Sequence, residues 1–362
     1  MSLRGDSRGL FRRMRDKVPL DLGNYPYVTA RVKAKKALLL PGETYEKLLK
    51  MSIAGIARVL GEGQYKEEVV ALGTRYSGVD LVEMATRNNL AKVFTQIIEF
   101  SEGPLKEMIA RFLDRWDVWN IKTILRGKFY AATEQEIMED MIPAGSFSKE
   151  FLESLVMMEE VDEIIVALEG TLYGQALVGL LARPEEIRSL APYEDLLDRV
   201  YYDFLLDAVP PSSEPKKLFH NFVRMEIDVI NTRTLLRVRG IEALGERQIF
   251  IRNGLFFSEE ELREMVGLEL PTLMQSLSRA PFYADLAPYL REGEERVSQG
   301  IRAMEKWLLN QAAKGANLHP LSVLPVLDYI IAKTKEVENL RIVARGKASG
   351  LNVELIREML VI

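Results

Sequence analysis

Three stretches of this 362-residue chain repeat one pattern of charged and amide side chains. Each stretch reads acid, Val, any residue, Asn, any residue, Lys or Arg, three further residues, and Arg. The acid, the asparagine and the final arginine of the three copies are Asp117, Asn120 and Arg126; Asp228, Asn231 and Arg237; and Glu336, Asn339 and Arg345. Carboxylates repeated in this way could act as general bases or as oxygen ligands for a cation.

The sequence around the three acids favours a structural role over a reactive one. Each acid is expected in a different domain, and we expect nothing near it to supply a second carboxylate or a nucleophile–base pair. We therefore predict that the acid and the asparagine form hydrogen bonds with a neighbouring helix, because buried polar groups are rarely left unpaired. We predict no catalytic residue, no cofactor, no metal and no small-molecule substrate.

A helix is the element that must position these groups. At 3.6 residues per turn, Val118, Ile121, Ile124 and Leu125 share one face, and the other two copies repeat this apolar stripe. The acid falls within the stripe, the asparagine lies at its edge, and the final arginine points the opposite way. Asp and Asn are mediocre helix formers. Their repeated placement in a buried stripe therefore indicates a shared tertiary partner.

The spacing of the copies predicts repeated domains. The copies begin at residues 117, 228 and 336, so they lie 111 and 108 residues apart, far more than the roughly 20 to 50 residues of solenoid repeats. A Thr-x-Tyr-like corner precedes each copy, and a glycine turn with a helix N-cap follows it. We predict three homologous helical bundles over residues 24–143, 144–252 and 253–362, after a basic extension over residues 1–23.

Helical patterning extends over most of the chain. Apolar residues recur at helical spacing over residues 79–100 and 105–127, and Thr133 with Glu136 forms the sequence of a capping box. Strand-like alternation is absent apart from the brief stretch from Arg247 to Ile251. These features predict an all-α fold.

Composition excludes several classes of function. The net charge of −5 argues against nucleic acid as the main partner, because binding phosphates requires concentrated Lys and Arg. The absence of cysteine excludes disulfides and thiolate metal sites and fits a reducing compartment. His220 and His319 stand alone, and no P-loop motif is present.

The sequence predicts neither a membrane span nor a signal peptide. No run approaches the roughly 20 apolar residues of a membrane-spanning helix, and the N-terminus lacks the apolar core of a signal peptide. Residues 1–17 are rich in Arg with apolar residues at roughly helical spacing. This segment is either a solvated tail or an amphipathic stretch that lies on an anionic membrane surface.

Several of these motifs together resemble a known family. The run from Asn24 to Lys35 (NYPYVTARVKAK), the Thr-x-Tyr corners and the three acid–Asn–base motifs resemble the C subunits of A-type (V/A-type) ATP synthases, a family that includes the d subunits of V-type ATPases. The resemblance extends from about residue 24 to the end of the chain. It implies three helical subdomains about a pseudo-threefold axis, forming a funnel.

The resemblance also implies a function without catalysis. Members of the family are central-stalk adaptors on the cytoplasmic face of the membrane, between the proteolipid ring and a central shaft made of subunits D and F. They transmit torque during proton or sodium translocation coupled to ATP synthesis or hydrolysis. We predict that the basic N-terminal region faces the ring or the lipid headgroups. The acidic stretches at residues 259–261 and 292–295 are candidates for the shaft side.

Two other functions are compatible with the sequence. A free-standing helical scaffold or regulator would have the same repeats, and an enzyme with a carboxylate site inside the funnel is the third possibility. The sequence does not specify the direction of the reaction, the coupling ion, the ring stoichiometry or the interface residues.

Overall fold

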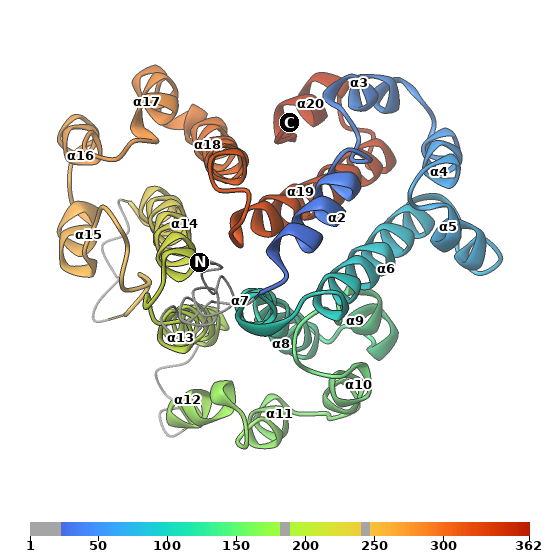
Figure 1. Ribbon diagram of the computed structural model, residues 1–362, viewed down its shortest axis with the longest axis horizontal. Helices are drawn as coiled ribbons and strands as arrows, with labels where there is room; N and C mark the ends of the chain where they lie inside the picture. Colours follow the sequence, from blue (N-terminus) through green and yellow to red (C-terminus); the bar gives the residue numbers. More distant parts are fainter. Residues whose placement is uncertain (1–22, 182–188, 240–246) are drawn as a thin grey trace, which may run out of the picture.

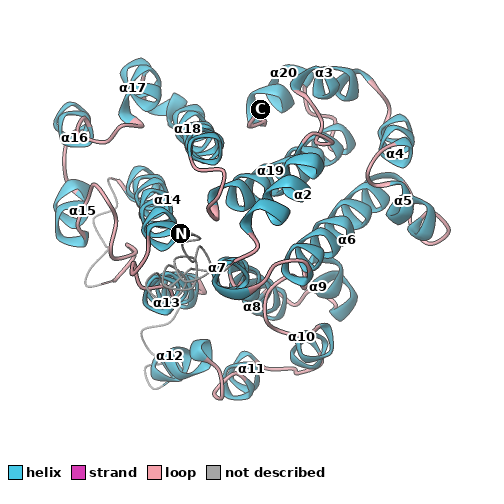
Figure 2. Cartoon of the chain, in the orientation of Figure 1, coloured by secondary structure: helices cyan, strands magenta, loops and turns pink. Residues whose placement is uncertain are grey.

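The computed structural model describes residues 23–181, 189–239 and 247–362, which form helices and loops and contain no strand (Figure 2). This confirms the all-α prediction for the described residues. The basic extension predicted over residues 1–23 lies, apart from Gly23, outside them. Among the described helices, none has both the length and the apolar character needed to cross a bilayer.

Long helices surround the centre of the molecule as three antiparallel hairpins (Figure 1). The first hairpin joins α6 (Gly78–Glu99) to α7 (Gly103–Leu113) and α8 (Arg115–Phe129). The second joins α13 (Ala191–Ala208) to α14 (Glu214–Val238), and the third joins α18 (Val297–Leu318) to α19 (Leu324–Ala348). The three motifs lie on α8, α14 and α19.

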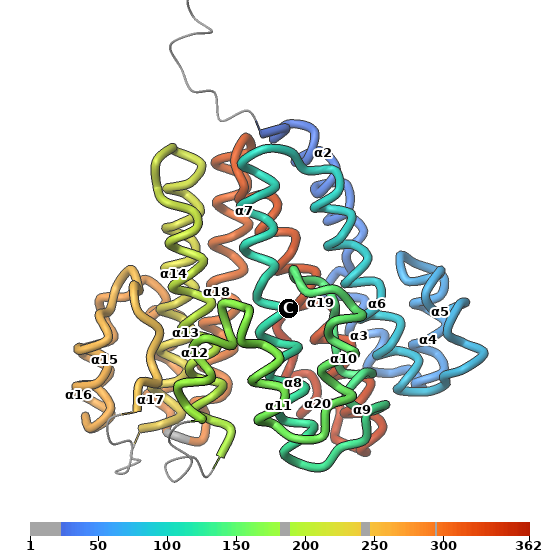
Figure 3. Tube along the Cα trace, turned by 90° about the horizontal axis from the view of Figure 1, so that it is seen from below, coloured from blue at the N-terminus to red at the C-terminus, as the bar shows by residue number. Residues whose placement is uncertain are grey.

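The turns of the three hairpins lie at the same end of the molecule (Figure 3). Pro104, Pro215 and Pro325 each occupy the first turn of the returning helix. Proline suits that position because its missing N–H would have no partner there and its fixed φ matches a helix. The sequence therefore specifies where each returning helix begins.

Neighbouring hairpins pack in a closed order. Helix α8 packs against α13, α14 packs against α18, and α19 packs against α6. Each motif helix therefore contacts the first long helix of the next hairpin, and the last hairpin contacts the first.

Short helices form the outer part of the molecule (Figure 1). They are α3 (Gly42–Lys50), α4 (Ile53–Glu62), α5 (Lys66–Leu72), α9 (Glu134–Asp140), α10 (Lys149–Val156), α11 (Val161–Ala167), α12 (Leu172–Leu181), α15 (Glu259–Val266), α16 (Leu270–Leu277), α17 (Tyr283–Glu292) and α20 (Val353–Met359). Helix α2 (Tyr25–Lys36) lies further in, alongside α19 (Figure 1). The capping box predicted at Thr133 and Glu136 is present at the start of α9.

The helix predicted over residues 105–127 is interrupted at one residue. Asp114 separates α7 from α8, and its carbonyl accepts hydrogen bonds from the N–H groups of both Asp117 and Val118. Its carboxylate contacts Ser146 and pairs with Arg111. The interruption depends on these tertiary contacts, which helical periodicity does not reveal.

The two ends of the described chain share one apolar core. Tyr45, Leu48 and Ile56, from α3 and α4, are buried in the same cluster as Leu340 of α19 and Ile356 of α20. A larger cluster connects the remaining helices. Burial of apolar surface from opposite ends of the chain therefore closes the arrangement of helices.

Candidate functional site

The three motif asparagines make the same pair of hydrogen bonds. Asn120 donates from Nδ2 to the carbonyl of Ile142 at 2.8 Å and accepts at Oδ1 from its N–H at 2.7 Å. Asn231 does the same with Ile251, at 2.7 and 2.9 Å. Asn339 does the same with Val361, at 2.8 and 3.0 Å. Each buried amide side chain thus holds an extended segment against its motif helix.

Two of the motif acids bind the loop that follows this segment. Asp117 accepts hydrogen bonds from the backbone N–H groups of Ser146 at 2.8 Å and Phe147 at 3.0 Å. Asp228 accepts from those of Leu255, Phe256 and Phe257 at 2.6, 2.9 and 3.2 Å. The partners are therefore loop amides, whereas the sequence pattern predicts a neighbouring helix.

A glycine permits the close approach of each loop to its acid. A Cβ atom at Gly145 would lie 2.2 Å from Oδ1 of Asp117, and one at Gly254 would lie 2.5 Å from Oδ1 of Asp228. No side chain fits at those distances. The glycine turns that mark the repeat boundaries in the sequence are therefore required by the buried carboxylates.

The third acid, Glu336, has partners from the other end of the chain. Its carboxylate accepts from the N–H of Leu40 at 2.5 Å, from Nε2 of Gln64 at 2.7 Å and from the hydroxyl of Tyr65 at 2.5 Å. Nζ of Lys333 lies 3.1 Å away. The loop before α3 thus contacts Glu336 as the loops before α10 and α15 contact Asp117 and Asp228.

The base within each motif bridges to the next hairpin. Lys122 pairs with Asp198 of α13 at 2.5 Å, and Arg233 pairs with Glu305 of α18 at 3.3 Å. Arg341 lies 3.6 Å from Glu83 of α6. These three bases join neighbouring hairpins, a role that the repeated Lys or Arg of the sequence pattern did not by itself reveal.

The final arginines of the motif differ in their contacts. Arg126 forms two hydrogen bonds with Glu194 of α13, at 2.5 and 2.8 Å. Arg345 binds Glu83 of α6, with Nη2 at 2.8 Å. Arg237 is exposed near the end of α14. The first two therefore strengthen the same contacts between hairpins as the motif bases.

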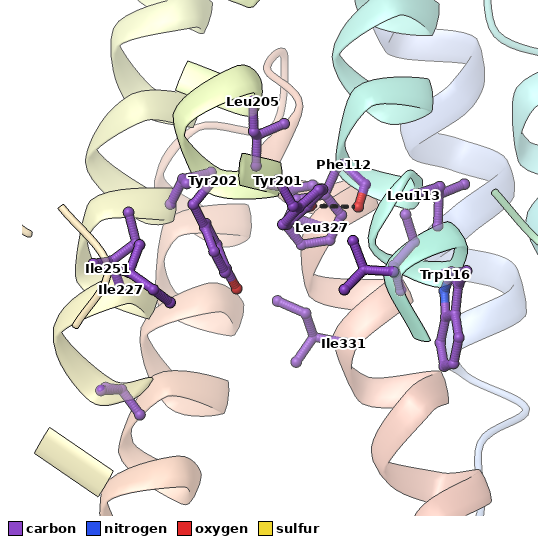
Figure 4. Packing of buried hydrophobic residues seen from close by; sticks show 14 of the residues in the cluster. Phe112, Leu113, Trp116, Tyr201, Tyr202, Leu205, Ile227, Ile251, Leu327 and Ile331 are labelled. Carbon is purple, nitrogen blue, oxygen red and sulfur yellow. Dashed lines mark hydrogen bonds between the residues drawn. The ribbon is translucent and has the colours of Figure 1, made fainter. Parts of the chain in front are cut away.

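A cavity of about 340 Å³ lies between the hairpins. The motif valines Val118, Val229 and Val337, one from each copy, all line it. Figure 4 shows Tyr201, Tyr202 and Ile331 pointing into this interior from α13 and α19, with the Tyr201 hydroxyl donating to the carbonyl of Phe112 at 2.9 Å. The motif helices therefore present equivalent faces to one central space.

One partly buried ion pair joins two of the motif helices beside this cavity. Arg115 forms two hydrogen bonds with the carboxylate of Glu226, at 2.8 and 2.9 Å, and its guanidinium carbon lies 3.6 Å from the centre of the Phe112 ring. The two residues are 111 apart and occupy the same position of the repeat with opposite charges. That offset is the sequence signal by which the pair could have been found.

The site has the chemistry of a binding surface. Asp114 lies near Asp117, so the prediction of no second carboxylate there was wrong, and both acids are hydrogen-bonded within the fold. Within residues 23–181, 189–239 and 247–362, no cluster of three or more His, Cys, Asp or Glu could hold a metal ion. The central cavity is lined by apolar and charged side chains, and these can bind a partner.

The raised pKa values of the buried aspartates make the free energy of unfolding depend on pH. Burial raises the pKa of Asp117 to about 7 and that of Asp228 to about 6, against the opposite effect of the backbone N–H groups. In an unfolded chain an aspartate has a pKa of about 3.9, so between that pH and the folded pKa the folded protein binds more protons than the unfolded chain. We therefore expect the free energy of unfolding to fall as pH rises from about 4 to about 7.

Urea unfolding of the wild type and of Asp117→Asn across that pH range measures this dependence. The asparagine cannot titrate, so the variant should show a shallower decline than the wild type. Equal pH slopes for the two proteins would contradict the raised pKa of Asp117.

The chain is similar to known proteins along nearly its whole length. Residues 28–359 match the family described as ATP synthase (C/AC39) subunit. The chain is 40% identical over 342 residues to the C subunit of the A-type ATP synthase of Methanococcoides burtonii, covering 94% of both chains. It is 38% identical over 343 residues to that of Haloferax volcanii, covering 94% of this chain and 98% of the relative. It is 36% identical over 341 residues to that of Archaeoglobus fulgidus, covering 93% and 96%.

Proposed function

The chain belongs to the family of ATP synthase (C/AC39) subunits, and from this premise we propose that it is the central-stalk adaptor of a rotary A-type ATP synthase. It is a non-catalytic subunit of a membrane-bound complex and works with the other subunits of that complex. In the proposed role it links the proteolipid ring to the shaft of subunits D and F and transmits torque between them.

The single observation that supports this role best is the closed set of hairpins around a central cavity. Ion pairs and buried apolar contacts connect every hairpin to the next. Close-packed helices deform little under load, and torque transmission requires such stiffness. The cavity, whose walls come from all three hairpins, offers side chains of the shaft a contact within a rigid frame.

The three homologous domains over residues 24–143, 144–252 and 253–362 are part of the proposal. The recurring hydrogen bonds of Asn120, Asn231 and Asn339 support a common origin and a structural role for the motif. Helices α3 and α4 pack with the third motif helix, α19. This packing favours an arrangement in which the short helices α3 and α4, from the N-terminal part of the chain, pack into the third bundle.

We assign the end of the molecule with the hairpin turns to the proteolipid ring. This end exposes Leu318 and Leu321, at 66% and 63% of their surface, and the described chain begins there with α2 (Figure 3). The protein would then lie peripherally on the cytoplasmic face of the membrane. The opposite, wider end would receive the shaft.

The acidic stretches of the last third contribute less to the proposed shaft contact than their charge suggests. Glu259 pairs with Arg252 and Arg263, and Glu261 pairs with Arg279. Ion pairs within the chain leave less charge for a partner. The cavity walls are the stronger candidate for the shaft contact.

Reconstitution tests the proposed role directly. The purified chain is mixed separately with a D–F complex and with a detergent-solubilised proteolipid ring, and each mixture is separated by size-exclusion chromatography. We expect a stable complex with each, and one assembly when all are combined. Failure to bind either component would favour the free-standing scaffold.

A further inference from the structure

We infer that the central cavity accepts its partner in one rotational orientation, with an apolar face of the partner against Trp119 and a carboxylate side chain of the partner beside Arg341. This inference rests on the proposed function and takes the partner to be the end of the shaft. It goes beyond that function by assigning the residues that fix the orientation.

The three walls of the cavity differ at one equivalent position of the repeat. Trp119 on α8, Ile230 on α14 and Glu338 on α19 occupy that position, and all three line the cavity. One wall is therefore aromatic, one aliphatic and one acidic. If the partner were turned by one third of a rotation, each of its faces would meet a different one of these three side chains.

Trp119, on the aromatic wall, has the exposure and the packing of a residue that anchors a binding partner. Trp119 is 39% exposed, and its ring packs edge-to-face on that of Trp116 with centroids 6.0 Å apart. Trp116 in turn packs against Phe94 at 6.1 Å. A large aromatic ring held in place and facing a cavity loses little conformational entropy on binding, and tryptophan is enriched among binding hot spots.

A buried donor beside this anchor also lacks an acceptor. Trp116 is 7% exposed and lines the cavity, and its Nε1 has no hydrogen-bond acceptor among the described residues. An unmatched buried N–H is costly. Because this N–H is closed off by the fold, the exposed ring of Trp119 is the part of the wall that a partner can contact.

The charges near Arg341 complement an acidic partner. Arg87, Arg341 and Arg345 share two carboxylates, those of Glu83 and Asp140. Arg87 lies 2.6 Å from Asp140, whereas Arg341 lies 3.6 and 3.8 Å from its acids.

Arg341 therefore retains the capacity to bind a further carboxylate. Together with Trp119 it also lines a second cavity that adjoins the first. Glu338 on the same helix pairs with Lys335 at 2.7 Å. A carboxylate turned away from Arg341 toward Glu338 would meet a like charge.

Affinity for a purified D–F complex tests the aromatic anchor. Trp119→Ala should weaken binding by about 30-fold or more, as expected for a hot spot, while the matched change Ile230→Ala on the second wall should weaken it by less than about 5-fold. Trp119→Phe should restore most of the loss. Equal effects at the two positions, with unchanged melting curves, would overturn the inference.

A second pair of variants tests the charge. Arg341→Gln should weaken binding about 10-fold and reduce its dependence on salt, because one charge pair is lost across the interface. Arg233→Gln, at the equivalent position of the second copy, should change affinity much less. An unchanged salt dependence in Arg341→Gln would contradict the predicted carboxylate contact.

Cross-linking tests the single orientation itself. The chain contains no cysteine, so Ile230→Cys and Glu338→Cys each introduce one reactive thiol and leave Trp119 and Arg341 intact. With a cysteine-directed photo-cross-linker, each thiol should reach a different residue of the shaft. Cross-links from both positions to the same shaft residues would show several orientations and overturn the inference.

The two levels of proposal fail in different ways. If the wild-type chain does not bind the D–F complex, the proposed function fails and the inference fails with it. If the wild type binds and the Trp119 and Ile230 variants behave alike, only the inference fails.

Discussion

Asp228→Ala is expected to lower the free energy of unfolding by about 3–5 kcal/mol. The carboxylate accepts three backbone N–H groups, those of Leu255, Phe256 and Phe257, and is buried. Its removal leaves these donors without their acceptor and releases the loop before α15. Each unmatched buried donor costs about 1–3 kcal/mol, and water entering the space offsets part of this cost.

Urea unfolding followed by circular dichroism measures this loss. Asp228→Asn keeps one oxygen acceptor at the same place, so it should lose only about 1–2 kcal/mol. Glu264→Ala, an exposed acid of α15, should change the stability by no more than about 0.5 kcal/mol. If the three variants were equally stable, Asp228 would have no structural role.

The second large effect is expected where the two ends of the chain meet. Lys333→Met should lower the free energy of unfolding by about 3–5 kcal/mol, because it leaves the buried carboxylate of Glu336 without its cation. The Lys333 side chain is fully buried, and its Nζ lies 4.0 Å from the centre of the Tyr65 ring. Solvent therefore has little access to the carboxylate and cannot take over the role of the ammonium group.

A double-mutant cycle separates the pair from its surroundings. Lys333→Met combined with Glu336→Gln removes both charges and keeps one oxygen acceptor, which can serve the N–H of Leu40, so it should recover much of the lost stability. Strictly additive losses would contradict a coupled pair.

Glu336→Ala offers a local measurement of the same contact. Because Glu336 binds Leu40, Gln64 and Tyr65, its loss should raise amide hydrogen exchange in residues 38–72 more than in α10–α12. Equal changes in both regions would argue that the N-terminal helices do not depend on this contact.

The sequence predicted the features that depend on neighbouring residues. The all-α class, the capping box at Thr133 and the helix over residues 79–100 followed from periodicity and from side chains within a few positions. The repeated motif also indicated that Asn120, Asn231 and Asn339 share an environment. Such features are local because helical hydrogen bonds join residues four positions apart.

Only the tertiary structure decided the partners of the buried acids. Asp117 and Asp228 bind loop amides about 30 residues later, whereas Glu336 binds Leu40 and Tyr65 nearly 300 residues earlier. No periodicity in the sequence encodes which loop reaches a carboxylate. Closing a chain over such separations depends on the whole set of buried contacts.

The exposure of Trp119 and the carboxylates that Arg341 shares with other arginines were likewise decided only by the tertiary structure. The sequence shows that Trp119, Ile230 and Glu338 occupy equivalent positions of the repeated motif and that their side chains differ. It does not show that all three face one cavity, since that depends on how three hairpins close around an axis. The sequence pattern indicated the motif helices, while packing between the hairpins determined which side chains line the cavity, because side chains far apart in the chain become neighbours only through the burial of apolar surface.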